Sequence, residues 1–359
     1  MMSRIEQARR RLEAEGGGVL VLPPGDDLFY LLGYTPHPDE RPCYLFLSPE
    51  EVLFLVPELN AAEAAPHVPF PTITYADAQG PRAALREAHR RLGAPPLVAV
   101  GDTMRADALL LLQELWPQAR FIPGGRVMAP LRMVKSAQEI AALHRAAATA
   151  DAAVEAVFTA AGPGMREADL KRVAEDAFYA AGAQEVPFAI IAAGANSAFP
   201  HHSTSTAVGR AGDPILVDLG SRVDGYMSDI TRMAFLGPPS ARYREIHMLV
   251  EEAVRAALEA IRPGVPIREV DLAARRVIER AGYGDRFTHR TGHGIGVSVH
   301  EAPSVTCTNE QALEAGMTFS VEPGIYLPGE FGVRLEEIVV VTAQGPQILS
   351  RLPREVRVL

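Results

Sequence analysis

Two apolar runs in the second half of the chain each carry an aspartate, and an Asp-Gly pair lies between them. Asp218 stands within PILVDLG, and Asp229 stands within SDITRMAF. An Asp-Gly pair between apolar runs is a strong signal for a β-hairpin. If Val223-Asp224 form its tip, the two carboxylates lie directly opposite each other; if Asp224-Gly225 form it, they lie diagonally. In both registers they share one face within about 5–8 Å.

Like charges on one face of an apolar hairpin destabilise it unless a cation lies between them. The alternative is that one aspartate belongs to the turn and the other points to solvent. Asp218 follows Ile-Leu-Val and precedes Leu-Gly, which favours burial. The pair therefore predicts a cation site.

A second predicted hairpin poses the same problem with glutamates. Glu322 stands within TFSVEPG and Glu336 within VRLEEIVVV, and the two are symmetric about Gly329. A loop of odd length would place them opposite each other. The apolar run after Glu337 predicts a strand buried on both faces, where a carboxylate is costly without a partner. Alternation along a strand does not choose between Glu336 and Glu337.

Histidines and glycines are concentrated in THRTGHGIGVSVHE, residues 288–301. Glycines on both sides of His293 remove side-chain bulk, so its imidazole can reach a ligand while the backbone closes around it. The alternative is a structural core histidine, but three histidines with this glycine spacing favour ligand or acid–base chemistry. His300-Glu301 does not begin an HExxH zinc motif, because Ser304 replaces the second histidine. His201, within FPHH, is either a site residue or part of an exposed loop.

Two divalent cations would neutralise the four negative charges of the predicted site. Its four negative charges and one neutral nitrogen come from Asp218, Asp229, Glu322, Glu336 and His293. Oxygen-rich ligation with one imidazole suits Mn²⁺, Co²⁺ or Zn²⁺ better than a metal that prefers thiolates. Two such ions about 3.5–4 Å apart can activate water and polarise a carbonyl.

Length and periodicity predict two domains for the 359 residues. Residues 1–125 alternate short apolar runs with helical patterns, which is typical of a small α/β domain. Pro- and Gly-rich residues 122–130 mark the boundary, so residues 126–359 form the second domain. The expected strands are 19–22, 43–47, 52–56 and 97–100, and the expected helices are 82–92 and 107–116.

The second domain contains a short internal repeat. PGMREADL at 163–170 resembles PGVPIREVDL at 263–272, and each copy follows a long helical pattern and precedes a strand-rich segment. The first long helix begins at a capping box formed by Ser136 and Glu139. We therefore expect two related helix-helix-strand halves, with the site where they meet.

Charge and cysteine content narrow the cellular setting. The formal net charge of −9 argues against nucleic acid or an anionic membrane surface as the main partner. Cys43 and Cys307 lie far apart, so we expect a reducing cytoplasm rather than a disulfide framework. The charged N-terminus lacks the pattern of a secretory signal, and no uncharged apolar run approaches the roughly 18 residues of a membrane span.

At these residues the sequence resembles the pita-bread metallopeptidases, which include prolidase, aminopeptidase P and methionine aminopeptidase, with the metal-free creatinase as a relative. The resemblance covers about residues 126–359 and rests on VDLG, SDITR, GHGIG, VHEAP, VEPGIY and VRLEE. It implies an α/β, creatinase-type N-terminal domain followed by an α+β pita-bread catalytic domain with pseudo-two-fold halves.

The resemblance also implies roles for individual residues. The positions that match the family's ligands to two metal ions, with Mn²⁺ expected first, are Asp218, Asp229, His293, Glu322 and Glu336. His201 and His300 match histidines that assist the substrate and the tetrahedral intermediate. Arg334, two residues before Glu336, belongs to the same motif and is assigned to substrate binding.

Relatives with this N-terminal domain act on Xaa-Pro bonds and are commonly homodimers in which that domain overhangs a neighbour's site. The implied reaction is hydrolysis of the amide between a first residue and proline in short peptides. Asp229 and its metal would anchor the free amine, and a bridging hydroxide would attack the carbonyl. Glu322 would move the proton, while His201 and His300 would donate to the reacting oxygen or the proline side.

Substrate length separates two members of this family. A dipeptide presents a carboxylate beyond proline, for which a cationic clamp is the natural counterpart. Many prolidases carry an arginine in an HExPR motif, but Ser304 stands at that position here. Arg41, between proline-stiffened turns in TPHPDERP, is a candidate substitute that could reach a neighbouring site. We favour an Xaa-Pro dipeptidase over an aminopeptidase P that acts on longer peptides.

Two further classes remain as alternatives on the same scaffold. A metal-free creatinase-like hydrolase and a non-enzymatic binding module should each lack part of the ligand set. The complete set in this chain disfavours both.

Overall fold

The computed structural model describes residues 2–359, and the chain divides into two compact units after Arg132. The sequence placed the boundary earlier, between residues 125 and 126. Helix α6 (Gly125–Met133) occupies the stretch in between. The Tyr30 hydroxyl donates to the Leu131 carbonyl at 3.0 Å, and Arg132 pairs with Asp27 at 2.7 Å, so this helix is tied to the first unit.

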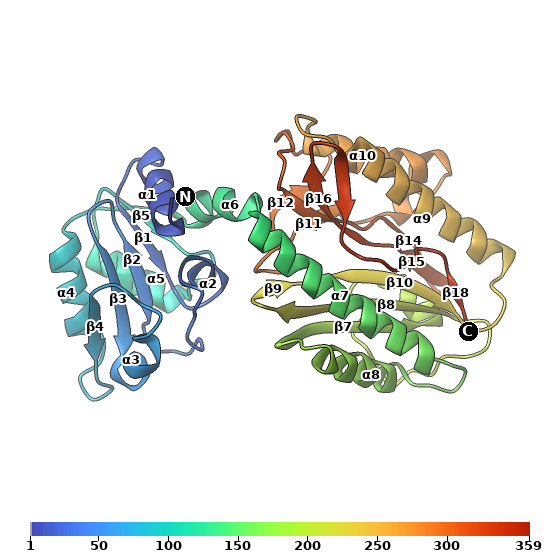
Figure 1. Cartoon of the computed structure of the whole chain (residues 1–359), viewed down its shortest axis with the longest axis horizontal. Helices are drawn as coiled ribbons and strands as arrows, with labels where there is room; N and C mark the ends of the chain where they lie inside the picture. Colours follow the sequence, from blue (N-terminus) through green and yellow to red (C-terminus); the bar gives the residue numbers. More distant parts are fainter. Residues whose placement is uncertain (1) are drawn as a thin grey trace. The chain divides into compact units, whose positions relative to one another are not determined.

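The first unit is a mixed sheet with the strand order β4-β3-β2-β1-β5-β6, surrounded by helices (Figure 1). Strands β1, β2 and β5 are buried at every position, which matches their unbroken apolar sequences. Periodicity predicted β1, β5 and α4 with their observed bounds, whereas α1, α3 and β4 bury few residues and were missed. The bounds are α1 (Arg4–Ala14), β1 (Val19–Leu22), α2 (Asp26–Leu32), β2 (Tyr44–Leu47), β3 (Val52–Pro57), α3 (Glu58–Ala64), β4 (Thr72–Tyr75), α4 (Arg82–Leu92), β5 (Leu97–Val100), α5 (Ala106–Leu115) and β6 (Arg120–Pro123).

The second unit consists of two halves built on the same plan. In the first half, α7 (Ala137–Ala160) precedes α8 (Glu167–Ala180); in the second, α9 (Ala241–Ala260) precedes α10 (Ile267–Arg280). Arg166, the residue before α8, forms an isolated β-bridge with Val208, and Pro266, the residue before α10, forms a matching β-bridge with Ala312. The sequence echo therefore corresponds to a structural repeat, and the predicted pita-bread architecture is confirmed.

Each half is built around one sheet, and β18 from the C-terminal end of the chain joins the sheet of the first half. The first has the order β18-β10-β8-β7, with β9 paired to β8, and the second has the order β12-β11-β13-β16-β17; β14 and β15 form a separate ribbon. The remaining bounds are β7 (Glu185–Ala193), η1 (Gly194–Ala198), β8 (Pro214–Val223), β9 (Tyr226–Met227), β10 (Ile230–Phe235), η2 (Gly284–Arg286), β11 (Gly292–Gly294), β12 (Glu301–Val305), β13 (Thr318–Val321), β14 (Gly324–Leu327), β15 (Phe331–Arg334), β16 (Glu337–Thr342), β17 (Gly345–Ile348) and β18 (Arg357–Val358).

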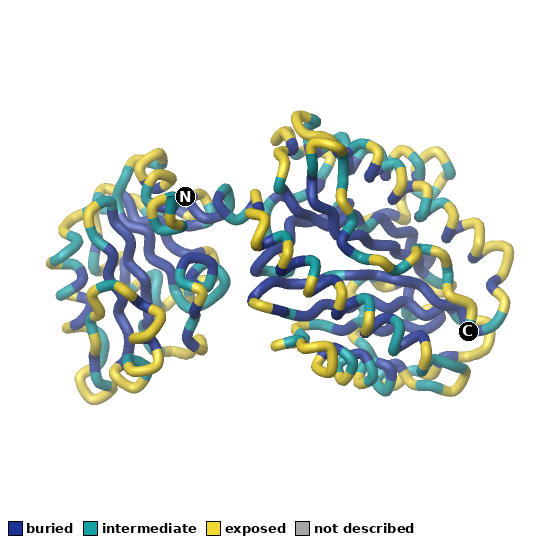
Figure 2. Tube along the Cα trace, in the orientation of Figure 1, coloured by how far each residue is buried: buried dark blue, intermediate teal, exposed yellow. Residues whose placement is uncertain are grey.

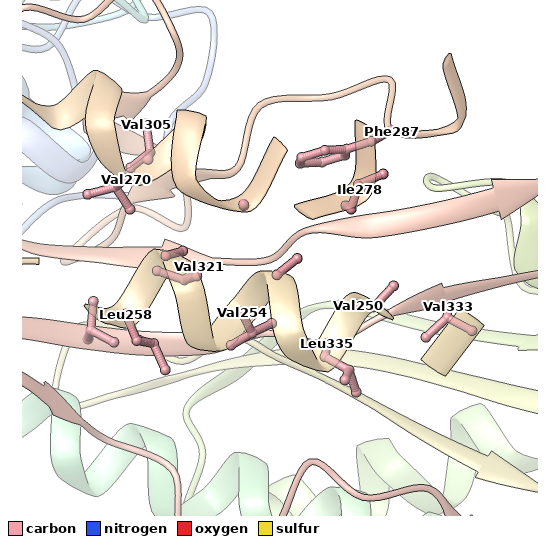
Figure 3. Packing of buried hydrophobic residues seen from close by; sticks show 14 of the residues in the cluster. Val250, Val254, Leu258, Val270, Ile278, Phe287, Val305, Val321, Val333 and Leu335 are labelled. Atoms are coloured by element: carbon pink, nitrogen blue, oxygen red, sulfur yellow. The ribbon is translucent and has the colours of Figure 1, made fainter. Parts of the chain in front are cut away.

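Apolar helix faces cover both sheets. Val154 of α7 and Phe178 of α8 pack against Val217 of β8 in one core cluster. In the other cluster, Val250 and Val254 lie along the face of α9 that meets the second sheet (Figure 3). The central strands beneath are buried, and the exposed residues lie on the outer helix faces and in the loops (Figure 2). Among residues 2–359, no helix combines the length and apolarity needed to cross a membrane.

A buried arginine fastens the C-terminal segment to the first sheet. Arg232 of β10 is 1 % exposed; it donates to Glu337 at 2.8 Å and to the Leu352 and Pro353 carbonyls at 2.9 and 3.0 Å. We expect Arg232→Met to lower the free energy of unfolding by about 3–5 kcal/mol, because it leaves these acceptors buried without their donor. Urea denaturation measures the change.

Arg210 provides the matched control, because its side chain is exposed. Arg210→Met should change the free energy of unfolding by no more than about 0.5 kcal/mol. Equal stability of Arg232→Met and Arg210→Met would contradict the role assigned to the buried guanidinium.

Candidate metal and substrate site

A cavity of about 630 Å³ in the second unit gathers most of the residues that the sequence singled out. These are His201, Asp218, Asp229, His293, His300, Glu322, Arg334 and Glu336. The other lining residues are Phe188, Ile190, Pro200, His289, Arg290 and Val299. Acidic, imidazole and guanidinium groups thus share one pocket with an apolar wall, which is the composition of a site that binds a small polar molecule.

The aspartate hairpin adopts the second of the two registers that the sequence allowed. Val223 pairs with Tyr226, so Asp224-Gly225 form the turn, with φ of 50° and 79°. Positive φ at both central positions is the requirement of a type I′ turn, which Asp-Gly meets at low cost. Thr231 pairs with Asp218, so Asp229, two residues earlier, lies diagonally from Asp218.

The glutamate hairpin places Glu322 and Glu336 at facing positions. Gly324 pairs with Arg334 on one side of them, and Val321 pairs with Glu337 on the other, so both pairings keep the centre at Gly329. The two glutamates occupy the gap between these paired stretches. The neighbouring Glu337 accepts from Arg232 and Arg354 instead of facing the cavity.

His293 reaches the acids because its glycine neighbours let other strands approach. A Cβ on Gly292 would lie 1.8 Å from the Ser320 carbonyl oxygen, and a Cβ on Gly294 would lie 2.1 Å from that of Ala302. No side chain larger than hydrogen fits at either position. The His293 Nε2 atom lies 3.2 Å from Glu322 Oε1 and 3.6 Å from Asp229 Oδ2.

Donor atoms of Asp229, His293 and Glu336 all lie within 4.8 Å of one another. Two buried carboxylate oxygens beside them, Asp218 Oδ1 and Glu336 Oε1, accept no hydrogen bond from any residue between 2 and 359. An unpartnered buried carboxylate oxygen is costly in a protein interior. Oxygen and imidazole donors converging around such atoms fit a divalent cation.

The electrostatics of the acids point the same way. Burial, followed by the charges of Glu336 and Asp218, raises the pKa of Asp229 well above its usual range. Burial and the charge of Glu322 likewise raise the pKa of Glu336. Burial opposes ionisation of Glu322 too, but the hydrogen bond and charge of His293 lower its pKa to about 2. Without added positive charge, Asp229 and Glu336 therefore stay protonated to a higher pH than usual.

Arg334 belongs to a hydrogen-bonded network with Thr231, Tyr326 and His289, residues that received no individual role from the sequence. Its Nη2 pairs with Asp218, its Nη1 donates to the Tyr326 hydroxyl at 2.8 Å, and its Nε donates to Thr231 Oγ1 at 3.1 Å. Thr231 also donates to Glu336 at 2.9 Å, and Tyr326 lies 2.8 Å from His289 Nε2. Thr231 and Tyr326 stood inside the motifs SDITR and VEPGIY, which was the available signal.

His201 and His300 also line the cavity, and both residues remain partly exposed to solvent. The His300 ring meets the His293 ring edge-on, with 4.1 Å between centroids. Although His300 is partly exposed, desolvation of the part of its ring that faces the cavity, then the charges of His293 and Arg290, lower its pKa to about 4. His300 is therefore a neutral hydrogen-bonding group at neutral pH.

Arg41 lies in the first unit and is absent from this lining. It borders a separate cavity of about 430 Å³. Its guanidinium donates to Asp77 at 2.9 and 3.0 Å and to Asp39 at 3.0 Å. These carboxylates already neutralise the guanidinium within the same chain. A role for Arg41 in a neighbouring chain's site stays a prediction.

Comparison with known proteins agrees with this geometry. Residues 141–343 match metallopeptidase family M24, and residues 4–134 match the creatinase/prolidase N-terminal domain. The probable dipeptidase PepE of Mycobacterium tuberculosis is 39% identical over 349 residues, which cover 95% of this chain and 92% of that protein. The Xaa-Pro dipeptidase of Pyrococcus furiosus is 31% identical over 356 residues, 99% of each chain. The prolidase structure from Thermococcus sibiricus superposes with a TM-score of 0.95 at 31% identity, covering 99% of this chain and 98% of that one.

Proposed function

The chain belongs to metallopeptidase family M24, and from this membership we propose that it hydrolyses the peptide bond of Xaa-Pro dipeptides. The observation that carries the proposal is the convergence of four carboxylates and the His293 imidazole in one cavity. Relatives that span nearly the whole chain and are named Xaa-Pro dipeptidase or prolidase support the choice of substrate.

We assign two divalent cations to this cavity. The residues that would hold them are Asp218, Asp229, His293, Glu322 and Glu336. The fit rests on the unpartnered oxygens of Asp218 and Glu336 and on the oxygen-rich donor set, which suits Mn²⁺ first and Co²⁺ or Zn²⁺ next. When bound, the ions would supply Lewis acidity toward a carbonyl and toward water.

The chain's own groups would then orient the peptide and move protons. The carboxylate of Asp229 attracts the free amino group of the first residue. Glu322, whose Oε1 accepts from Ser320 Oγ at 3.0 Å, takes a proton from the attacking water and delivers it to the departing proline nitrogen. His201 and His300 donate hydrogen bonds to the reacting oxygen or to the proline side.

Hydrolysis assays with an Xaa-Pro dipeptide and the matched Xaa-Ala dipeptide test the proposal. The Mn²⁺-loaded protein should cleave the Xaa-Pro bond and prefer it to Xaa-Ala. No cleavage, or equal rates on both substrates, would contradict it. A preference for an Xaa-Pro tripeptide over the dipeptide would instead favour an aminopeptidase. We also propose that the protein is cytoplasmic and that it forms a homodimer. Sedimentation of the purified protein would test the homodimer.

Glu167 at the start of α8 holds the loop that carries His201. Its Oε1 accepts from the Ala193 amide at 2.9 Å, and its Oε2 accepts from Ser205 Oγ and His202 Nε2 at 2.7 and 2.9 Å. Burial alone would raise the pKa of Glu167, but these hydrogen bonds lower it. The carboxylate is therefore a purely accepting anchor.

We expect Glu167→Gln to lower kcat/KM for an Xaa-Pro dipeptide about 10- to 100-fold. The glutamine NH₂ group would face groups that themselves donate hydrogen bonds, and the loop that carries His201 would shift. Asp176→Asn on the exposed face of α8 is the matched control and should leave the rate unchanged. Equal rates for both variants would show that the anchor does not position the loop.

A further inference from the structure

A buried ion pair joins the start of the second unit to the strand that follows His300. Lys135, two residues before α7, donates from Nζ to Glu301 Oε1 at 2.7 Å, and the two side chains are 1% and 6% exposed. The same Nζ lies 3.4 Å from the Met133 carbonyl oxygen. Neither partner lines the cavity, but Glu301 begins β12 directly after His300, which does line it. The pair therefore touches the cavity only through the chain next to that histidine.

The identity of the basic residue in this pair is informative. Of the 35 lysine and arginine residues in the chain, only Lys135 and Lys171 are lysines. Lys171 lies on the surface, 3.8 Å from Glu175, where either basic residue would serve. An ammonium group is compact, whereas a guanidinium is a wide planar fork. A lysine at the buried position of an arginine-rich chain indicates a confined space in which Nζ holds one carboxylate.

The carboxylate of Glu301 packs against the third glycine of GHGIG. A Cβ on Gly296 would lie 2.6 Å from Glu301 Oε1 and 2.9 Å from Oε2, so the carboxylate fills the place of a side chain there. The Gly296 carbonyl accepts from the Met227 amide of β9 at 2.8 Å, and the Val297 carbonyl accepts from Arg222 of β8 at 2.7 Å. The segment after His293 is thus held between the first half and Glu301.

His300 is the last residue of this segment, and its ring has no hydrogen-bonding partner of its own among the described residues. The ring meets that of His293 edge-on, with 4.1 Å between centroids. The location of the imidazole in the cavity therefore depends on where the backbone of residues 295–300 places it. Contacts that fix this backbone also fix the histidine.

We propose that the Lys135–Glu301 ion pair positions His300 for the peptidase reaction, so that Lys135 and Glu301 are positioning residues outside the cavity. The inference rests on the proposed function, in which His300 donates a hydrogen bond to the reacting oxygen or the proline side. Lys135 holds the carboxylate, the carboxylate holds the backbone at Gly296, and this backbone presents the imidazole. A displacement of about 1 Å at a reacting group can lower the rate about 100-fold.

Kinetics of Glu301→Gln test the inference, because glutamine keeps the size of the side chain and removes its charge. In the Mn²⁺-loaded protein, kcat for an Xaa-Pro dipeptide should fall about 10- to 100-fold with little change in KM. Lys135→Met should lower kcat in the same way from the other side of the pair. Lys171→Met removes the other lysine of the chain, at the surface, and should retain the wild-type kcat.

A double-mutant cycle with His300→Asn separates positioning from a general structural role. In the His300→Asn background, Glu301→Gln should change kcat by less than about threefold, because the group that the pair positions is no longer there. The Mn²⁺ content of Glu301→Gln should equal that of the wild type. An equal loss of kcat in both backgrounds, or wild-type kcat in Glu301→Gln, would overturn the inference and leave the peptidase proposal standing.

Hydrogen exchange of the metal-free protein gives a measurement that does not depend on turnover. Amides of residues 295–300 should exchange faster in Glu301→Gln than in the wild type, while those of α8 should not change. Unchanged exchange at 295–300 would overturn the inference whatever the kinetics show. Wild-type protein that cleaves no Xaa-Pro dipeptide would overturn the proposed function, and faster exchange in the variant would then still show that the pair holds this segment.

Discussion

Replacing Asp229 by Asn should lower kcat/KM for an Xaa-Pro dipeptide by about a thousandfold or more, which corresponds to about 4 kcal/mol of transition-state stabilisation. Asn keeps the size of the side chain but removes its charge. Asp229, His293 and Glu336 converge within 4.8 Å, so this one change weakens the set that would hold a cation. Steady-state kinetics at saturating Mn²⁺ measure the loss.

The same substitution should stabilise the protein when metal is removed. Because burial, Glu336 and Asp218 raise the pKa of Asp229, its folded state retains a proton that the unfolded state has released. Stability of the metal-free protein therefore falls as pH rises from the ordinary value of 3.8 toward the raised one. Asp229→Asn lacks this penalty, so with chelator at neutral pH it should unfold at a higher urea concentration than wild type.

Asp224→Asn in the same hairpin is the matched control. Asp224 lies at the turn and forms an exposed pair with Arg145 at 2.7 Å. Its loss should cost no more than about 1 kcal/mol of stability and leave turnover unchanged. Turnover by Asp229→Asn within tenfold of this control, or lower metal-free stability than wild type, would contradict the role of Asp229.

Glu322→Gln should have the second largest effect, a fall in kcat of about 100- to 1000-fold. The amide preserves an oxygen near Ser320 but has no carboxylate to accept the proton of the attacking water. Glu322 lies 3.2 Å from His293, so the variant also removes one charge from the ligand set. Comparing kcat with KM separates slower chemistry, which lowers kcat, from weaker substrate binding.

Glu330 offers a control in the loop of the same hairpin. Its side chain is 53% exposed and lies 3.7 Å from Arg242. Glu330→Gln should retain the wild-type kcat. If Glu322→Gln also kept it, proton transfer by Glu322 would be excluded.

The site could be predicted from the sequence because its acids stand in apolar segments, where water cannot solvate their charges. Asp218 within ILVDLG, and the Glu336-Glu337 pair before IVVV, stand in apolar strands where a carboxylate requires a partner. Strand alternation alone did not separate Glu336 from Glu337. Pairing with Arg232, a residue more than a hundred positions away, decides that choice, and such long-range contacts leave no local signal.

The supporting residues of the cavity were harder to predict for the same reason. Tyr326 lies in β14 and His289 lies in the loop before β11, and only the folded chain brings the Tyr326 hydroxyl within 2.8 Å of His289 Nε2. The expected domain boundary also missed helix α6, because Pro130 and its neighbouring glycines suggested a linker. The Tyr30 hydroxyl that fixes this helix lies about a hundred residues away along the chain.

Metal analysis of the purified protein, with turnover before and after chelation, tests the central claim most directly. If the acids of the two hairpins are held together by dications, reconstitution with Mn²⁺ should load two ions per chain and support cleavage of an Xaa-Pro dipeptide. A chelator should abolish that cleavage, and added Mn²⁺ should restore it. Full turnover by protein that contains no metal would contradict the account.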